Sequence, residues 1–415
     1  MLNKIIFALF LAALCLRPFL PAFTYPKEDI LLSLCIIAMS VLLFLSNAGA
    51  GIEPGSRLHS AFKRQDKAIL ISLCLYFTAI LASTFFSKDT GTSLSHFYKY
   101  AAYLFVFIAV LGLAPEKQKM LALLLLANSG LVSMRAIQWF VGGTFRALDY
   151  LSYHGIGWNF AVEFLSRARA FMPFILPNDL AGYLILFIPL AIALLFQKNE
   201  KAHSQLTGLS ARNIYFLLVA SSTVIVLLST QSLGAIASLL AAVIIFGFMQ
   251  KKNNIKNRFA VIAALFLASG FVLMLLLRLK NPHEFNHPLF SLNERLSYWR
   301  HAFGVIRQHP FTGVGPGNYP FFKSLWVHNA YLQAWAETGP LSLVGLVGIA
   351  TATLRINFNN ISAGDDKRFI RSLWVGNLAF LIHNMVETTF FRPEISLQWW
   401  VFAAILCAAH TKYQK

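Results

Sequence analysis

Charge is scarce in this sequence, and negative charge is the scarcer kind. Only 13% of the 415 residues are charged, and 35 Lys and Arg stand against 17 Asp and Glu, which gives a formal net charge of +18. A soluble domain carries about 25% charged residues, so the composition excludes an ordinary soluble protein. Cysteine is also rare. Cys15, Cys35, Cys74 and Cys407 lie inside apolar runs without a CxxC spacing, which excludes a disulfide framework and a cysteine zinc site.

Hydrophobic residues make up 57% of the chain and recur in long runs. A helix of about 20 apolar residues crosses about 30 Å of hydrocarbon, so the fold class is an all-α polytopic membrane protein. The first run lacks a small-x-small cleavage site and is predicted to be a helix rather than a signal peptide. The predicted spans are 5–23, 29–46, 68–86, 97–113, 119–141, 179–196, 213–229, 233–249, 258–279, 331–354, 370–390 and 395–411.

Two larger segments, 142–178 and 280–330, interrupt the spans of what we predict to be a single membrane domain over 1–415. Lys and Arg gather in one set of short loops and at both termini, whereas the opposite short loops hold only Lys27, Lys88, Lys99 and Arg392. Basic residues collect on the cytoplasmic side of a membrane. Both termini are therefore predicted to be cytoplasmic in a bacterial inner membrane, with both large segments facing the periplasm. Since the positive charge mostly reflects this topology, no nucleic-acid partner is predicted.

The two outward segments also contain basic residues, although basic residues usually collect on the cytoplasmic side. They are Arg146, Arg167, Arg169, Arg278, Lys280, Arg295, Arg300, Arg307 and Lys323. Arginine forks match the oxygens of phosphate groups, so the cluster points to a lipid-linked phosphate or pyrophosphate. The competing interpretation is pairing with nearby carboxylates and with membrane lipid headgroups.

A histidine at the start of a predicted helix is the best candidate for acid–base chemistry. His328 opens the stretch HNAYLQAWAETG and would share a helix face with Leu332 and Trp335. A neutral imidazole near arginines can accept a proton from a sugar hydroxyl. A hydrogen-bonded interfacial histidine without a catalytic role explains the pattern equally well.

A second histidine pattern spells HExxH, from His283 to His287. Zinc proteases need both imidazoles on one helix face, but Pro282 and Pro288 bracket the five residues and Pro288 disfavours helical angles at His287. Zinc proteolysis is therefore a minor alternative, and neither a metal nor a cofactor is predicted.

Four further patterns bear on the fold. The loop from His309 to Asn318 is rich in glycine and is predicted to be shaped by it. Arg295, Trp299 and Phe303 predict an amphipathic helix on the membrane surface. Pro177 with Asn178 predicts a helix start. His383 and Glu387 are predicted to share one face of a span and to bond to each other.

These residues together resemble the O-antigen ligase and polymerase superfamily. Its "R…F..PN..A" element is similar to Arg169, Phe174, Pro177-Asn178 and Ala181. Its "R…W…hP..G.GpG.y" element resembles Arg295 to Trp299 followed by HPFTGVGPGNY, and its histidine-x10-glycine element resembles His328 to Gly339. One departure is that Ser232-Leu233-Gly234-Ala235 lacks the arginine that many members carry there, for which Arg146, Arg167 or Arg300 would have to compensate.

The resemblance implies a metal-independent, inverting glycosyltransferase. It implies an undecaprenyl-pyrophosphate-linked glycan as donor and a lipid A–core acceptor, joined at the periplasmic face during lipopolysaccharide biosynthesis. His328 would deprotonate the acceptor, and Arg169 and Arg295 would hold the pyrophosphate. Contacts to the substrates are assigned to Arg300, Asn329, Glu337, Arg167 and Arg146.

Other functions remain open at this point. The nearest is the O-antigen polymerase, which uses the same donor, and the histidine-x10-glycine element favours the ligase over it. A protein O-glycosyltransferase is third. A lipid or glycan transporter also explains many spans, but it would place its ionisable residues at mid-membrane.

Overall fold

The computed structural model describes residues 2–46, 67–155, 168–196, 211–249, 255–279, 287–319, 326–356, 358, 360–361 and 365–413. These residues form thirteen α-helices and two short 3-10 helices, and they contain no strand. The predicted all-α fold is therefore confirmed. The helices are α1 (Leu2–Leu16), α2 (Pro26–Ser46), α4 (Lys67–Phe85), α5 (Thr90–Leu111), α6 (Pro115–Tyr153), α8 (Pro177–Leu195), α9 (Ala211–Ser229), α10 (Leu233–Met249), α11 (Ile255–Leu279), α12 (Pro288–Gln308), α13 (Ala330–Leu354), α14 (Asp365–His383) and α15 (Pro393–Tyr413).

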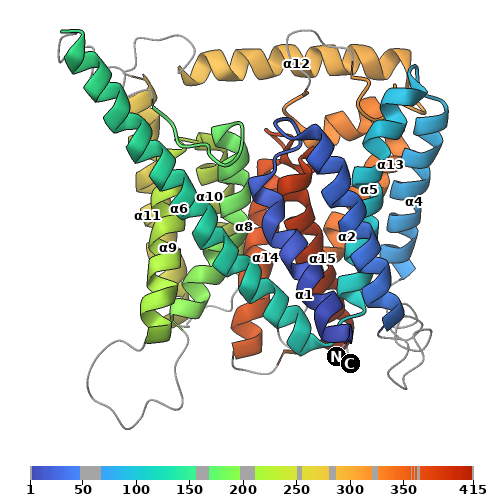
Figure 1. The fold of residues 1–415 in the computed structure, drawn as a ribbon, viewed down its shortest axis with the longest axis horizontal. Coiled ribbons are helices and arrows are strands. Elements are labelled where there is room, and N and C mark those ends of the chain that lie inside the picture. Colours follow the sequence, from blue (N-terminus) through green and yellow to red (C-terminus); the bar gives the residue numbers. More distant parts are fainter. Residues whose placement is uncertain are drawn as a thin grey trace.

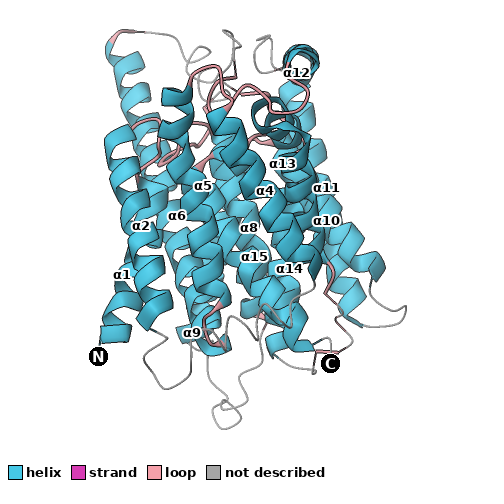
Figure 2. Cartoon of the chain, turned by 90° about the vertical axis from the view of Figure 1, so that its right-hand side faces the viewer, coloured by secondary structure: helices cyan, strands magenta, loops and turns pink. Residues whose placement is uncertain are grey.

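Twelve of these helices form a bundle, and α12 lies across one end of it (Figure 1). Figure 2 shows α12 end-on above the other helices. The start of α1 and the end of α15 both lie at the opposite end of the bundle (Figures 1 and 2). The amphipathic helix predicted around Arg295 is thus present as α12, outside the bundle proper.

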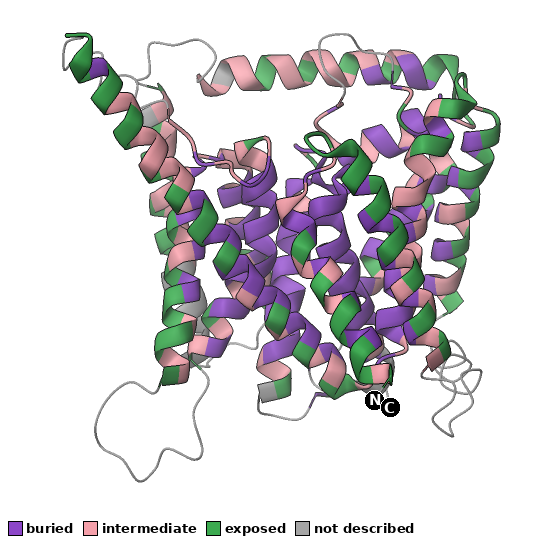
Figure 3. Cartoon of the chain, viewed as in Figure 1, coloured by how far each residue is buried: buried purple, intermediate pink, exposed green. Residues whose placement is uncertain are grey.

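Eight of the described helices are long and apolar enough to cross a membrane. Their outward faces carry large exposed apolar side chains such as Leu31, Leu131 and Leu218, and Figure 3 shows these exposed faces around a buried interior. Water would not favour such faces, whereas lipid does. The remaining predicted spans correspond to α10, α11, α14 and α15. The last two pack at the centre of the bundle (Figure 1), where Asn377 Nδ2 donates to Thr353 Oγ1 at 2.9 Å and Gln398 Nε2 donates to the Leu14 carbonyl oxygen at 3.1 Å.

Several predicted boundaries were wrong. The helix predicted over 119–141 continues to Tyr153 as α6, because the polar residues after Gly142-Gly143 still favour helix and contain no proline. The first span ends earlier than predicted, with a 3-10 turn at Arg17–Phe19, because Pro18 and Pro21 interrupt the helix. The helix predicted over 370–390 ends at His383, which changes the site described below.

Candidate functional site

Arg295 lies on α12, where it reaches down to the bundle. Its Nε donates to the Val386 carbonyl oxygen at 2.9 Å, and its guanidinium also contacts the Glu387 carboxylate and the Ser291 hydroxyl. The planar fork of arginine fixes a direction that a lysine ammonium would not. The side chain keeps 20% of its surface exposed, so it faces both the buried carboxylate and the outer surface.

His328 precedes α13 by two residues. The prediction that it shares a helix face with Leu332 and Trp335 was therefore wrong. Its backbone has a φ of 53°, in the left-handed region that few residues adopt. Asn329 is the N-cap of α13, and its Oδ1 accepts hydrogen bonds from the backbone N–H groups of Tyr331 and Leu332 at 3.0 Å. The Tyr298 ring of α12 stacks on the imidazole with the centroids 5.4 Å apart. The cap and this stacking hold the imidazole at the end of the helix.

Glu387 lies in the turn after α14 and joins these two side chains. Its Oε2 is 3.0 Å from His328 Nδ1, and its other oxygen contacts Arg295. The expected pairing of His383 with Glu387 was wrong, because α14 ends at His383. There Asn384 Oδ1 accepts from the Phe390 N–H at 2.8 Å, and Asn384 O accepts from the Ala330 N–H at 2.8 Å. These bonds turn the chain and tie the Glu387 turn to the start of α13.

Asn178 and Arg169 extend this cluster toward α9. Asn178 Nδ2 donates to Glu387 Oε1 at 2.6 Å, and Asn178 Oδ1 accepts from Arg169 Nη2 at 3.1 Å. Arg169 Nε donates to the Thr230 carbonyl oxygen at 2.7 Å. Pro177 is the first residue of α8, as predicted, so Asn178 stands in the first turn of that helix. Residues from four separate parts of the chain therefore meet at one end of the bundle.

The electrostatics of the cluster are dominated by burial and by positive charge. Burial, followed by the charge of Arg278, lowers the pKa of Arg169 to about 10. Burial alone would raise the pKa of Glu387, but the charge and hydrogen bond of His328 and the charge of Arg295 outweigh it and hold that pKa below its ordinary value. Glu387 is therefore an anion at neutral pH. Arg278 was named from the sequence only as one of the outward basic residues. Glu387 was named as an ionisable residue in a predicted span, which is a functional signal, but it was paired with His383 rather than with His328.

This arrangement can hold a proton acceptor. Glu387, as an anion, accepts from an N–H at His328 Nδ1, so when the imidazole carries only that proton its lone pair is on Nε2. The same pairing orients the base in acyl-transfer triads. The positive guanidinium groups nearby suit a negatively charged substrate group.

The structure places the other predicted site residues elsewhere. Arg300 is exposed on α12 and Arg146 is exposed on α6. Glu337 is buried in α13, where Oε1 accepts from Gln333 Nε2 at 2.7 Å and Oε2 accepts from the Gly317 N–H at 3.2 Å. Arg167 and residues 283–286 of the HExxH pattern lie outside the described residues. Among the described residues, no group of three His, Cys, Asp or Glu side chains is placed to hold a metal ion.

The glycine-rich loop packs directly against α13. The Gly315 N–H donates to the Glu337 carbonyl oxygen at 2.8 Å. Gly339 interrupts α13 with a φ of 83°, and a Cβ there would lie 2.0 Å from the Phe311 carbonyl oxygen. The glycines at these positions permit close backbone contact, so this loop shapes the outer end of α13.

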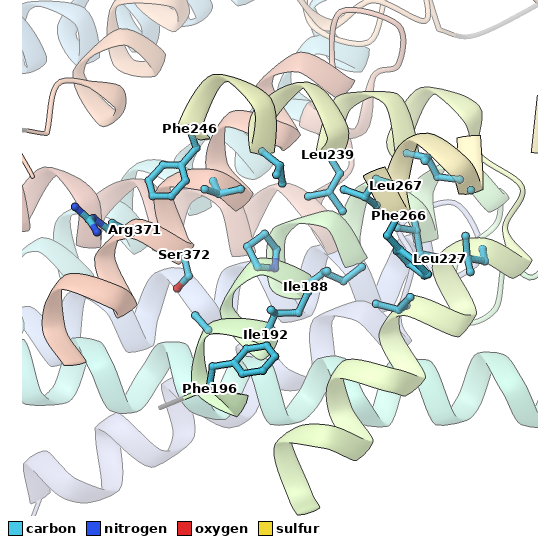
Figure 4. A pocket seen from close by; sticks show the side chains of 18 of the residues that line it. Ile188, Ile192, Phe196, Leu227, Leu239, Phe246, Phe266, Leu267, Arg371 and Ser372 are labelled. Carbon is cyan, nitrogen blue, oxygen red and sulfur yellow. The ribbon is translucent and has the colours of Figure 1, made fainter. Parts of the chain in front are cut away.

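An apolar cavity of about 530 Å³ lies among α8, α9, α10, α11 and α14. Figure 4 shows side chains such as Ile188, Leu227 and Leu239 surrounding it. Leu227 is three residues before Thr230, whose carbonyl binds Arg169, and Arg371 lines the cavity near the start of α14. The cavity therefore extends along the bundle from the neighbourhood of the arginines.

Comparison with known families bears on the assignment. The family described as O-antigen ligase matches residues 216–349. The matched residues are similar to that family, and this supports an assignment of the chain to it. A search of the curated proteins finds no match. The O-antigen ligase match contains Arg278, Arg295 and His328, whereas Arg169, Asn178 and Glu387 lie outside it. The family implies glycosyltransferase-like ligase activity on polysaccharide and lipid-linked substrates.

Proposed function

We propose that the protein is an O-antigen ligase that transfers a glycan from undecaprenyl pyrophosphate to lipid A–core oligosaccharide. The observation that carries this proposal is Glu387, which contacts both His328, the candidate base, and Arg295, a candidate phosphate ligand. Displacement of pyrophosphate by a hydroxyl requires a base for the hydroxyl and a cationic group for the leaving pyrophosphate. Here one carboxylate holds both candidates.

The acceptor proton is transferred to His328 during the attack. Nδ1 faces Glu387, so Nε2 takes the proton of the acceptor hydroxyl as its oxygen attacks the anomeric carbon of the donor sugar. The bond between that carbon and the pyrophosphate oxygen breaks, and its electron pair leaves with the pyrophosphate. Attack from the face opposite the leaving group inverts the configuration, and Glu387 stabilises the imidazolium that forms.

The arginines hold the leaving group. Arg169, Arg278 and Arg295 are electrostatically coupled, since Arg278 and Arg295 both act to lower the pKa of Arg169. Mutual repulsion in a buried setting favours a bound polyanion that neutralises it. The apolar cavity beside Arg169 suits the polyprenyl chain of the same donor. No step of this mechanism calls for a metal or an organic cofactor.

The site is assigned to the periplasmic face. Arg295 of the cluster is on α12, which crosses the end of the bundle opposite the chain termini (Figure 1), and the short loops predicted to lie on the same side as the termini carry most of the basic residues. Basic loops indicate the cytoplasmic side, so both termini are proposed to be cytoplasmic in the inner membrane. Arg300, Asn329, Arg167 and Arg146 remain proposed contacts for the substrates.

The experiment that tests the ligase assignment compares two acceptors. Purified protein in nanodiscs receives an undecaprenyl-pyrophosphate glycan together with either lipid A–core or a second undecaprenyl-pyrophosphate glycan, and products are resolved by mass. Transfer to lipid A–core is expected. Elongation of the second lipid-linked glycan alone would identify a polymerase instead, and transfer to neither by folded protein would contradict both assignments.

A further inference from the structure

The apolar cavity among α8, α9, α10, α11 and α14 carries positive charge on one side. Arg368 and Arg371 of α14, named here the Arg371 edge, are the only charged residues among the described side chains that line it. Side chains three residues apart share one face of a helix. Figure 4 shows Arg371 beside Phe246, on the opposite side of the cavity from Leu227 and Phe266. The cavity therefore combines an apolar interior with a cationic edge.

The Arg371 edge is far from the site around Glu387. Arg371 is twelve residues before His383, the last residue of α14, which corresponds to a rise of about 18 Å. The helix begins at the end of the bundle where the chain termini lie (Figure 1), whereas Glu387 follows its last turn. The Arg371 edge therefore cannot hold a pyrophosphate at Arg295, and the proposed function gives it no role.

The protein satisfies these two guanidinium groups only in part. Arg368 Nη1 donates to the Phe196 carbonyl oxygen at 3.2 Å, the one hydrogen bond that Arg368 makes among the described residues. Arg371 Nε is buried without a hydrogen-bond partner in the same part of the chain. The Arg371 guanidinium lies over the rings of Phe358 and Phe246, 5.6 and 6.0 Å from their centroids. Because a buried donor without a partner is unfavourable, an anionic acceptor at this edge would be stabilised.

Neighbouring side chains leave the positive charge of the edge unbalanced. Asp366 pairs with Lys119 at 3.0 Å, and Lys367 adds another cation to the same turn, where its Nζ donates to a loop carbonyl oxygen at 3.1 Å. Among the described residues, no carboxylate forms an ion pair with Arg368 or Arg371. The edge therefore suits a ligand that carries negative charge.

The cavity walls indicate what else this ligand contains. The lining residues Ile192, Phe196 and Phe266 keep 40%, 61% and 59% of their surface uncovered by protein. A free phosphate would leave these apolar surfaces without cover, which is unfavourable in water. A phosphate attached to a hydrocarbon chain covers them and also meets the arginines, whose forks match phosphate oxygens.

We infer that the Arg371 edge binds an anionic phospholipid, with its phosphate on the two arginines and one acyl chain in the adjoining part of the cavity. This inference goes beyond the proposed function, because it concerns a lipid that is neither donor nor acceptor. The polyprenyl chain proposed above enters from the end near Arg169, so the two lipids approach the cavity from opposite ends. Only the assignment of the phospholipid to the cytoplasmic leaflet rests on the orientation proposed above.

The test measures binding of dioleoylphosphatidylglycerol by native mass spectrometry on delipidated full-length protein in detergent. Arg371→Gln removes the charge and keeps most of the length of the side chain. Arg212→Gln on α9 is the matched control, because Arg212 also lies over a phenylalanine ring, 5.8 Å from the Phe216 centroid, but does not line the cavity. Ala193→Phe adds a ring to the apolar wall and keeps both arginines.

Arg371→Gln is expected to weaken binding about 10- to 100-fold, because a charge-assisted hydrogen bond to the phosphate is lost. Arg212→Gln should stay within about twofold of native, since charges outside the site are screened by salt. Ala193→Phe should weaken binding about 10-fold, as expected when two methylenes are excluded from the cavity. Dioleoylphosphatidylcholine, with the same chains and no net charge, should bind native protein more weakly.

Three results would overturn the inference. Equal weakening by Arg371→Gln and Arg212→Gln would show general attraction to basic residues. Native binding by Ala193→Phe, with displacement of the lipid by inorganic phosphate, would identify a site for a soluble anion. Tighter binding of undecaprenyl phosphate than of phosphatidylglycerol, lost in Arg371→Gln, would assign the edge to the carrier of the donor.

A second measurement keeps the test independent of folding defects and of ligase activity. Phosphatidylglycerol is expected to raise the unfolding temperature of native protein and of Arg212→Gln, but not that of Arg371→Gln, because a ligand stabilises only a form that binds it. If Arg371→Gln does not fold, Arg371→Lys replaces it and should bind more weakly than native, since an ammonium lacks the fork. Neither measurement requires glycan transfer, so failure of the ligase assignment leaves this inference standing.

Discussion

Glu387 and Glu337 are equally buried, each with 4% of its surface exposed, yet their surroundings differ. Glu387 contacts the ionisable groups His328 and Arg295, whereas Glu337 accepts hydrogen bonds from two neutral amide groups, Gln333 Nε2 and the Gly317 N–H. A buried anion needs charged partners or it is strongly destabilised. The comparison teaches that partners, rather than burial, distinguish a carboxylate held among ionisable groups from one that holds the glycine-rich loop.

The largest expected effect comes from Glu387→Gln, which keeps the size of the side chain and removes its charge. Transfer is expected to fall about 10²- to 10⁴-fold, as it does when the carboxylate of a catalytic triad becomes an amide, because the imidazole loses its oriented tautomer. Single-turnover transfer in nanodiscs measures the effect. Glu337→Gln is the matched variant, and its loss in kcat should be smaller. Equal losses in kcat from the two changes would refute the division of roles.

Arg295→Ala removes the guanidinium cation that contacts Glu387. Loss of one electrostatic contact to a leaving group costs about 10²- to 10³-fold in rate, and that fall is expected in the transfer assay. Arg295→Lys should recover only part of it, because an ammonium cannot fork between Val386 and Glu387. Arg307→Ala, exposed in the last turn of the same helix, serves as control and should retain native activity.

Gly339→Ala tests the packing of α13 against the glycine-rich loop, which is the part of the comparison that contains Glu337. The new Cβ would meet the Phe311 carbonyl oxygen and the backbone would remain at a φ of 83°, so we expect a loss of about 1–3 kcal/mol of stability. Thermal unfolding in detergent measures it. Gly304→Ala on α12 is the control, since a Cβ there meets nothing within 4 Å, and it should be neutral or stabilising. A native unfolding temperature for Gly339→Ala would contradict the described packing.

The smallest expected effect is the pH dependence of stability contributed by Glu387. Its pKa in the folded protein lies below the ordinary 4.5, so its contribution is complete above pH 4.5 and is lost as pH falls through the lower folded value. The difference in unfolding temperature between native protein and Glu387→Gln should therefore be constant near neutral pH and shrink in acid. A difference that grows as pH falls below 4.5 would show that Glu387 is not stabilised as an anion.

Much of this fold follows from local sequence. Apolar runs predicted the spans, the spacing of Arg295, Trp299 and Phe303 predicted α12, and Pro177 marked the start of α8. These features depend on neighbours within a few turns of the chain, where periodicity and proline chemistry apply.

The centre of the site could be predicted only in part. His328, Arg295 and Arg169 were named from their types and from a family resemblance, but the contact of His328 with Glu387 spans 59 residues. It depends on Asn384, which ends α14 and redirects the chain, and no local pattern indicates that turn. The left-handed backbone of His328 was missed for the same reason, because the neighbouring Asn329 reads as a helix position until its capping bonds are known.

The most direct test of the account is the His328→Asn variant. Asparagine tolerates the left-handed backbone that His328 adopts, so the fold is kept while the base is lost. Single-turnover transfer from the polyprenyl-pyrophosphate donor is predicted to fall about 10²- to 10⁴-fold, with partial recovery on adding imidazole. Transfer at the native rate by well-folded His328→Asn protein would contradict the assignment of His328 as the base.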